Sequence, residues 1–306
     1  MLKEAVDSTL KQSYEHVEII IVDDGSTDET KQTADALAND HTNIKCIRTA
    51  KQGPGPARQA GLDQAIGEYV QYLDSDDLLL PEKLKQQVAF LENEAAIDVV
   101  YCQQSLTDLS ANLIEHHWMR TGERHLTMFP AMLGGRIWGT AVPLYRRTLL
   151  NMAGPWKALS NFEDWEYDCR VAIHANKLAY VEQNLVNIRR HQEEHYGSEV
   201  NRHTNKLIDR TTALKLIASH ADTANIKHEH LEYKKFIRFC FFTCRQNAKA
   251  GLKRQAQELL VMINKFSANS LKHKCEYHSY YILSQLLGWQ FMGKISAQFD
   301  RLRSVL

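Results

Sequence analysis

The chain has 306 residues, of which 44% are hydrophobic, and equal numbers of acidic and basic side chains give it a formal net charge of zero. This composition is typical of a globular protein with one large or two smaller domains, and it excludes a wholly disordered chain. No stretch reaches the roughly 20 apolar residues of a membrane-spanning helix, and the N-terminus lacks a signal-peptide core, so we expect a cytoplasmic protein. The six cysteines show no paired metal-ligand spacing, which favours reduced thiols.

The two parts of the chain carry opposite charge. Residues 1–200 have 19 basic and 30 acidic side chains, a balance of −11, whereas residues 201–306 have 18 and 7, a balance of +11. An acidic half is a poor ligand for nucleic acid, so we expect no nucleic-acid partner. The basic half could contact anionic lipid at a membrane surface or could pack on the acidic half, and both alternatives stay open.

The first hundred residues alternate between extended and helical patterns. An apolar, β-branched run at Val17–Val22 predicts a strand buried on both faces. Ser26 and Glu29 then form a capping-box pattern, which predicts a helix that begins at Ser26. Further elements are expected as a helix after Pro56, a strand at Tyr69–Leu73, a helix after Pro81 and a strand at Ile97–Cys102. This alternation predicts a mostly parallel, doubly wound α/β sheet.

The pattern changes twice further along the chain. Residues 105–132 show weak periodicity, and we expect a variable loop region there. Beyond residue 197 the apolar residues recur at helical spacing, and a single last helix is predicted over residues 278–303. We therefore expect an α/β domain at residues 1–196 and a helical region at residues 197–306.

An acidic turn follows the strand predicted at Tyr69–Leu73. Asp74, Asp76 and Asp77 lie within four positions of one another. Carboxylates this close repel one another unless a cation joins them, and Mg²⁺ or Mn²⁺ prefers carboxylate oxygens together with substrate phosphates. The turn by itself leaves two alternatives open, a metal–diphosphate site and a solvated acidic turn in which Asp77 caps the following segment.

The order and flanking sequence of the acidic segments resemble glycosyltransferase family 2, whose members are inverting enzymes with the GT-A fold. The resemblance covers roughly residues 2–195 and implies a Rossmann-like, mostly parallel sheet flanked by helices. It rests on five blocks, namely Glu18–Asp28, Ala57–Gly61, Gly67–Asp77, Gly154–Glu166 and Arg189–His191.

The resemblance implies a site for a nucleotide-sugar donor, which we expect to be a UDP-sugar. Asp23 or Asp24 would accept a hydrogen bond from the nucleotide base, Arg58 would lie near the base and the diphosphate, and Asp74 would lie near the ribose. Departure of the nucleoside diphosphate builds negative charge on a phosphate oxygen, and a bound cation or a nearby arginine stabilises that charge.

The resemblance also implies a Mn²⁺ or Mg²⁺ site and a catalytic base. Asp76 and Asp77 of the Asp-x-Asp motif would lie nearest to the metal, with His191 facing the metal or the diphosphate, and which aspartate ligates directly stays open. Asp164 would take the proton from the acceptor hydroxyl as it attacks the anomeric carbon. Glu163 and Trp165 would orient the acceptor.

The implied function is metal-dependent transfer of a hexosyl or related group to a hydroxyl of a glycan or lipid-linked acceptor. The expected setting is cell-surface polysaccharide assembly on the inner face of the membrane, where the basic C-terminal helices could make peripheral contact. The alternative is a non-catalytic GT-A-like binding or scaffolding protein. The presence of Asp76, Asp77, Asp164 and His191 argues against that alternative.

The start of the chain departs from the family pattern. Family members begin with a strand that cradles the base, whereas the first pattern of this chain is the helix that would follow it. Without that strand, backbone groups of its neighbour would lack partners and one wall of the nucleotide pocket would be absent. We therefore expect an added upstream strand to raise thermal stability and nucleotide affinity.

Overall fold

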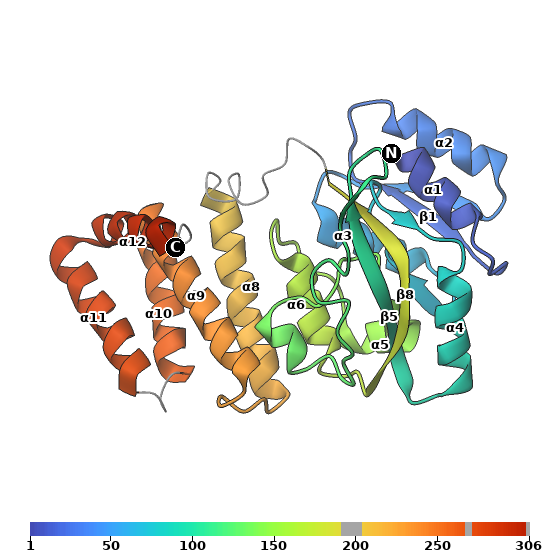
Figure 1. Cartoon of the computed structure of the whole chain (residues 1–306). Coiled ribbons are helices and arrows are strands. Elements are labelled where there is room, and N and C mark those ends of the chain that lie inside the picture. The colour runs from blue at the N-terminus through green and yellow to red at the C-terminus, as the bar shows by residue number, and fades with distance from the viewer. Residues whose placement is uncertain (191–203, 267–270, 304–306) are drawn as a thin grey trace. The chain divides into compact units, whose positions relative to one another are not determined.

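The computed structural model describes residues 1–190, 204–266 and 271–303. The chain divides into two compact units, the first made of residues 1–132, 136–158 and 163–194, and the second made of residues 133–135, 159–162 and 195–306. Every described strand lies in the first unit, and the second is built of helices (Figure 1). The expected domain boundary at residues 196 and 197 lies outside the described residues and stays a prediction.

The first unit contains a small parallel sheet of two strands. The β-branched run forms β1 (Ile19–Asp23), which pairs with β2 (Ile44–Arg48) and is joined to it through α2 (Thr30–Asp40). One face of this sheet buries an apolar cluster with α2 and with α1 (Leu2–Leu10). The buried members of that cluster are Val6, Ile21, Ala34, Leu37 and Ile44. α3 (Pro54–Gln64) contacts β1 as well.

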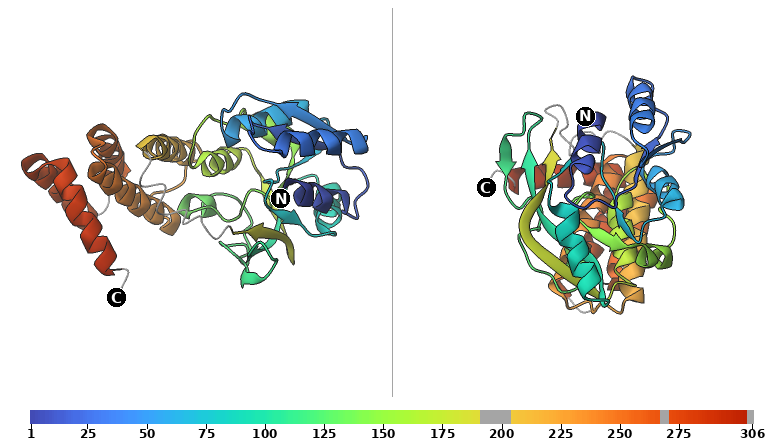
Figure 2. Two further views of the ribbon diagram at one scale, coloured as in Figure 1. Left: turned by 90° about the horizontal axis from the view of Figure 1, so that it is seen from above. Right: turned by 90° about the vertical axis from the view of Figure 1, so that its right-hand side faces the viewer.

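A six-stranded sheet forms the rest of this unit. Its strand order is β3 (Tyr69–Gln71), β7 (Leu144–Arg146), β5 (Ile97–Thr107), β8 (Lys177–Arg189) and β4 (Leu78–Leu79), with β6 (Leu113–Glu115) paired to β5. α4 (Lys83–Asn93) lies along the long β5–β8 pair in both figures (Figure 1, Figure 2). α5 (Arg147–Ala153) and α6 (Glu163–Val171) connect β7 to β8.

The α/β fold class is confirmed, but the expectation of a mostly parallel sheet is wrong in detail. Of the six strand pairs among the described residues, only β1–β2 and β5–β8 are parallel. A parallel pair needs a crossover connection, and helices supply one in these two cases. The short strands β3, β4 and β7 each run antiparallel to a neighbour. Within the described residues the two sheets share no strand, and the expected additional strand stays a prediction.

Two local predictions also need correction. The Asp23 carboxylate accepts a hydrogen bond from the Ser26 N–H at 2.9 Å, so Ser26 belongs to a turn and α2 begins only at Thr30. The region expected to be a variable loop contains core residues, because Met128 and Met132 are almost fully buried and β5 extends to Thr107.

The second unit is a group of helices arranged around α9 (Leu231–Lys249), which contacts α8 (Thr204–Thr223), α10 (Lys253–Phe266) and α12 (Trp289–Arg303). The residues of α9 predicted at helical spacing are buried, among them Ile237, Cys240 and Cys244. The single last helix that was expected is wrong. It is divided into α11 (Leu271–Leu287) and α12 by Gly288, whose φ of +92° favours glycine.

Over the residues that the structure describes, none of the helices combines the length and the apolar character that crossing a membrane would require.

Candidate active site

The acidic turn lies between β3 and β4, as the sequence predicted. The Asp77 N–H donates to the Asp74 carbonyl at 3.1 Å, which closes the turn, and Asp77 is buried whereas Asp74 is partly exposed. Burial raises the pKa of the Asp77 carboxyl to about 8, and the charges of Asp74 and Asp76 act in the same direction. The carboxylates of this turn therefore repel one another, and either a proton or a bound cation relieves that repulsion.

Arg189, the last residue of β8, fixes this turn from the neighbouring strand. Its N–H donates to Asp77 Oδ1 at 3.0 Å, its Nε donates to the Asp76 carbonyl, and its Nη1 contacts Glu4 Oε2 at 2.6 Å. The sequence suggested no separate role for Arg189 beyond its place in the last block. Its position directly after an apolar strand was the available signal. His191, two residues further on, lies outside the described residues.

Arg58 on α3 connects the acidic turn to the start of α6. Its Nη2 lies 2.8 Å from Asp74 Oδ1 and its Nη1 lies 3.0 Å from Glu163 Oε1. Burial alone would lower the pKa of Arg58, but the two carboxylates outweigh it and raise the pKa overall. Opposing influences act on Glu163 as well. Burial and the charge of Asp164 raise its pKa, and Arg58 lowers it in part.

Close packing makes the position of Arg58 possible. A Cβ on Gly55, one turn earlier in α3, would lie 2.3 Å from the Lys157 carbonyl oxygen, so only glycine lets the helix approach that loop. The Arg58 guanidinium lies 5.1 Å from the Trp156 ring centroid. That ring stacks on Tyr167 with centroids 3.8 Å apart, and its Nε1 donates to the Tyr72 hydroxyl at 3.0 Å. The guanidinium thus has a fixed aromatic support.

Asp23 and Asp24, at the end of β1, both use their carboxylates to shape loops. Asp24 accepts hydrogen bonds from Thr49 Oγ1 at 2.7 Å and from the Gly53 N–H at 2.7 Å. Burial would raise the pKa of Asp24, but these bonds together lower it. Because Gly53 directly precedes α3, Asp24 holds the end of the helix that carries Arg58. The structure therefore links Asp24, one of the two expected donor-binding acids, to the rest of the site, whereas Asp23 contacts Ser26 and Arg48.

Glu163, Asp164 and Trp165 begin α6. Acidic side chains in the first turn of a helix interact favourably with the backbone N–H groups there. Asp164 is partly exposed, and its Oδ2 lies 2.5 Å from Nη1 of Arg136. Trp165 is buried, and its indole N–H donates to the Met132 carbonyl at 2.7 Å. Any influence of Trp165 on an acceptor would therefore act through packing.

Three residues of this region were missed in the sequence. Arg136 contacts Asp164 and also Asp168, which lies one helical turn later, and Tyr145 donates to Asp168 at 2.8 Å. Arg136 lies just past the region expected to be variable, where no periodic pattern marked it. The four-residue spacing of Asp164 and Asp168 was the available signal, since it puts both acids on one face of α6.

Whether a metal ion could bind at the acidic turn depends on the donor atoms that lie there. Among residues 1–190, 204–266 and 271–303, no three His, Cys, Asp or Glu side chains are grouped so that they alone could hold a metal ion. Asp76 and Asp77 still offer the hard oxygen donors that Mg²⁺ and Mn²⁺ prefer, and such ions commonly use one or two carboxylates with substrate phosphates. The residues present therefore fit a metal that binds together with a diphosphate.

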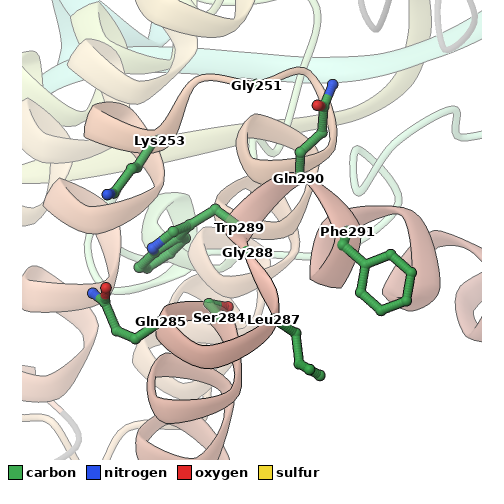
Figure 3. A pocket seen from close by; sticks show the side chains of 9 residues that line it. All are labelled: Gly251, Lys253, Ser284, Gln285, Leu287, Gly288, Trp289, Gln290 and Phe291. Atoms are coloured by element: carbon green, nitrogen blue, oxygen red, sulfur yellow. The ribbon is translucent and has the colours of Figure 1, made fainter.

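A cavity of about 540 Å³ lies in the second unit, at the turn between α11 and α12 (Figure 3). No carboxylate lines it; its lining includes Lys253, Ser284, Leu287, Trp289 and Phe291. Cavity volume therefore does not locate the chemistry of this chain. The cluster of acids and arginines in the first unit does.

The fold and this cluster define a glycosyltransferase of the GT-A type. Residues 1–149, slightly less than half of the chain, match the sequence model described as glycosyl transferase family 2. The resemblance seen in the sequence is thereby confirmed. The match ends before α6, so the roles of Glu163, Asp164 and Trp165 stay proposals.

Named relatives agree with this family. The chain is 34% identical over 115 residues to an uncharacterized glycosyltransferase of Haemophilus influenzae, which covers 37% of this chain and 46% of the relative. It is 26% identical over 245 residues to the Bacillus subtilis protein described as "Putative glycosyltransferase EpsH", and the match covers 76% of this chain and 68% of the relative. The chain thus spans less than half the length of the first relative.

Solved structures show the same fold. Residues 1–349 of S. aureus TarS, in complex with UDP-GlcNAc, have a TM-score of 0.72 and 21% identity, with 97% of this chain and 88% of that chain covered. The mannosyltransferase PcManGT of Pyrobaculum calidifontis, in complex with GDP-Man and Mn²⁺, has a TM-score of 0.56 and 16% identity, with 98% and 83% covered. At these identities the likeness shows the fold alone.

Proposed function

We propose that the chain transfers a sugar from a nucleotide-sugar, most simply a UDP-sugar, to a hydroxyl of a glycan or lipid-linked acceptor, with inversion of the anomeric centre. The observation that carries the proposal is the bridge made by Arg58, which joins Asp74 of the acidic turn to Glu163 beside Asp164. One cation thus connects the proposed donor side to the proposed acceptor side. TarS with UDP-GlcNAc and PcManGT with GDP-Man are consistent with a nucleotide-sugar as the class of donor.

On the donor side, Asp23 or Asp24 would accept a hydrogen bond from the base, and Asp74 would lie near the ribose. Arg58, which is paired to two carboxylates and supported by Trp156, would contact the diphosphate. A planar guanidinium suits this task because its fork of donors matches phosphate oxygens.

The proposed metal is Mn²⁺ or Mg²⁺, held by Asp76 and Asp77 with His191 nearby. A bound cation would stabilise the negative charge of the leaving diphosphate. The chain's own contribution is to keep the turn in place, which Arg189 does through Asp77 Oδ1 and the Asp76 carbonyl. The complex of PcManGT with Mn²⁺ is in keeping with this choice of ion.

On the acceptor side, Asp164 would take the proton of the attacking hydroxyl, and Glu163 and Trp165 would orient the acceptor. Attack from the face opposite the leaving group needs one carboxylate over the acceptor and no covalent nucleophile. Asp164 suits this position because its side chain is 26% exposed, whereas that of Glu163 is 11% exposed and paired to Arg58.

The test is release of nucleoside diphosphate from a panel of sugar nucleotides with Mn²⁺ or Mg²⁺ and candidate acceptors. We expect Asp164→Asn to lose turnover while it still binds the donor. Asp63→Asn changes an exposed acid on α3 that accepts a hydrogen bond from Gln59; it is the matched control and should keep turnover. Equal turnover in Asp164→Asn would remove the proposed base. Donor binding without turnover in the wild type, whatever the acceptor, would favour the non-catalytic alternative.

We also propose that the turn between α11 and α12 contacts the inner face of the membrane. Leu286, Leu287 and Phe291 are 75%, 53% and 53% exposed. In Figure 3, Leu287 and Phe291 point away from the buried Trp289. Exposed apolar residues gathered on one turn are typical of a surface that is covered by a partner.

The charge of this region supports anionic lipid as the proposed partner. Residues 253–303 carry eight basic and three acidic side chains, a balance of +5, and residues 277–299 contain no acid at all. Lys253 and Lys294 are exposed on either side of the turn in sequence. Apolar insertion combined with basic side chains gives binding to anionic bilayers.

Co-sedimentation with vesicles tests this surface without any need for activity. We expect binding to vesicles with anionic lipid and much weaker binding to neutral ones, with loss of binding in Leu286→Glu. Val261→Glu is the matched control, because Val261 is 71% exposed on α10. Self-association that Leu286→Glu abolishes, without vesicle binding, would instead show that a second copy covers this turn.

A further inference from the structure

Four polar side chains contact one another in a row, and the carboxylate of Asp164 is the outer end of that row. Arg136 contacts Asp164 Oδ2 through Nη1 at 2.5 Å and Asp168 Oδ2 through Nε at 2.9 Å. Tyr145, the middle residue of β7, donates its hydroxyl to Asp168 Oδ1 at 2.8 Å. The row of contacts thus runs from the sheet to the beginning of α6.

The side chains in this row become less buried toward Asp164. The side chains of Asp168, Arg136 and Asp164 are 2%, 13% and 26% exposed. Burial raises the pKa of Asp168, and the Arg136 charge and the Tyr145 hydroxyl act against that rise. Only the outermost carboxylate is open enough to meet a substrate. The inner groups are placed to act through it.

We propose that Arg136 is the positioning residue for Asp164, held in place by Asp168 and Tyr145. This inference rests on the proposed function, because it takes Asp164 as the group that receives the acceptor proton. Arg136 contacts Oδ2 of Asp164, and the backbone N–H of Trp165 donates to Oδ1 of Asp164 at 2.7 Å. The carboxylate is therefore fixed in orientation, and each oxygen keeps a further lone pair for the acceptor hydroxyl.

The charges around Asp164 make this role measurable. Arg136 contacts it, Asp168 lies one turn away, and Glu163 and Arg58 lie beside it at the start of α6. A paired cation keeps a carboxylate deprotonated to lower pH, whereas a neighbouring anion has the opposite effect. Replacing Arg136 and replacing Asp168 should therefore change the acidic limb of the activity profile in opposite directions.

The same helix offers a matched control. Arg170 pairs with the buried Glu166 at 3.0 Å and donates to the Ala153 carbonyl, so its contacts lie away from Asp164. Arg136→Gln and Arg170→Gln each remove an arginine from a buried pair on α6, so both should destabilise the protein. Only the first should alter the chemistry of Asp164.

The experiment measures kcat, donor KM and the pH dependence of kcat/KM, together with the melting temperature. We expect Arg136→Gln to lower kcat by about 10- to 100-fold with donor KM unchanged, a range ordinary for acid–base groups. Its acidic limb should move to higher pH, because the cation paired with the carboxylate is lost. Asp168→Asn should move that limb down, and Arg170→Gln should leave it in place.

Arg136→Lys serves as a second variant. Should Arg136→Gln fail to fold, Arg136→Lys keeps the charge but loses the two-sided contact; we then expect an unmoved limb with a smaller loss of kcat. Identical limbs in Arg136→Gln and Arg170→Gln, or a limb that Asp168→Asn moves upward, would overturn the positioning role. Full turnover in Asp164→Asn would instead refute the proposed base, so the two failures are distinguishable.

Discussion

Two of the places in the first unit that bury ionisable side chains surround them with opposite kinds of partner. Around Arg58 the partners are carboxylates, with Asp74 and Glu163 each within 3.0 Å of the guanidinium. Lys83 on α4 is fully buried, and within the described residues its Nζ donates to neutral amide oxygens, those of Gln71 and Gln87, with Gln87 at 2.5 Å. The first place depends on charge and the second avoids it.

The difference lies in what each place can do. The cluster at Arg58 adjoins an acidic turn with surplus negative charge, so it can respond to a cation or a diphosphate from outside. The amides around Lys83 are themselves saturated, because Gln71 donates to the Ala141 carbonyl and Gln87 donates to the Val100 and Val142 carbonyls. Burial of charge therefore indicates function only where the partners are incompletely matched.

Arg58→Met should give the largest effect. Two carboxylates would lose their shared cation, which for a buried pair costs about 3 kcal/mol or more, and donor binding should be lost as well. Chemical unfolding and donor titration measure the two effects. Arg254→Met is the control, since Arg254 is 85% exposed where it pairs with Glu258, and it should change neither stability nor donor binding appreciably. Equal losses in both variants would show that the Arg58 bridge contributes nothing special.

Lys83 should give the next largest effect, seen in the dependence of stability on pH. Burial lowers its pKa from 10.5 to about 8, so between these values the unfolded chain holds a proton that the folded chain has released. The free energy of unfolding should rise with pH over this window by roughly 3 kcal/mol. Urea unfolding at pH 7.5, 9 and 10 measures it.

Lys83→Met should remove this rise, and Lys85→Met should keep it, because the Lys85 side chain is 63% exposed. An unchanged rise in Lys83→Met would show that other groups, and not Lys83, cause the dependence of stability on pH.

Asp77 should affect stability with the opposite sign to Lys83. Its folded pKa is about 8 and its ordinary value is 3.8, so its contribution to stability is present below pH 4 and is lost as pH rises through 8. Asp77→Asn should therefore be more stable than the wild type at pH 9, by about 1–3 kcal/mol. It should also no longer bind Mn²⁺. Greater stability with unchanged Mn²⁺ binding would remove Asp77 from the proposed metal site.

Wild-type Mn²⁺ affinity should fall as pH drops below about 8, because the proton then competes for Asp77. Isothermal titration at pH 6.5 and 8.5 measures this competition. An affinity independent of pH would argue that Asp77 does not contact the ion.

Much of the fold and part of the site were predictable because their signals are local. The run Val17–Val22 gave β1, the stretch after Tyr69 gave β3 with its acidic turn, and the start of α6 carried Glu163 and Asp164. Each signal is a property of consecutive residues, such as periodicity, branching or capping chemistry. Such properties act before any long-range contact forms.

Other features could not be predicted, since they depend on where distant segments meet. The Ser26–Glu29 pattern failed because Asp23 takes the Ser26 N–H into a turn. The direction of β7 depends on its place between β3 and β5, and no local pattern encodes that place. The turn at Gly288 is visible only in its φ angle.

By itself the sequence determined the order of the elements, the opposite charges of the two parts of the chain, and the acids that follow its strands. The tertiary structure alone decided which cations meet those acids. Arg58 reaches Asp74 and Glu163 across 16 and 105 positions, and Arg136 reaches Asp164 across 28. The physical reason is that a charge pair forms wherever packing brings its members within about 4 Å, whatever their separation along the chain.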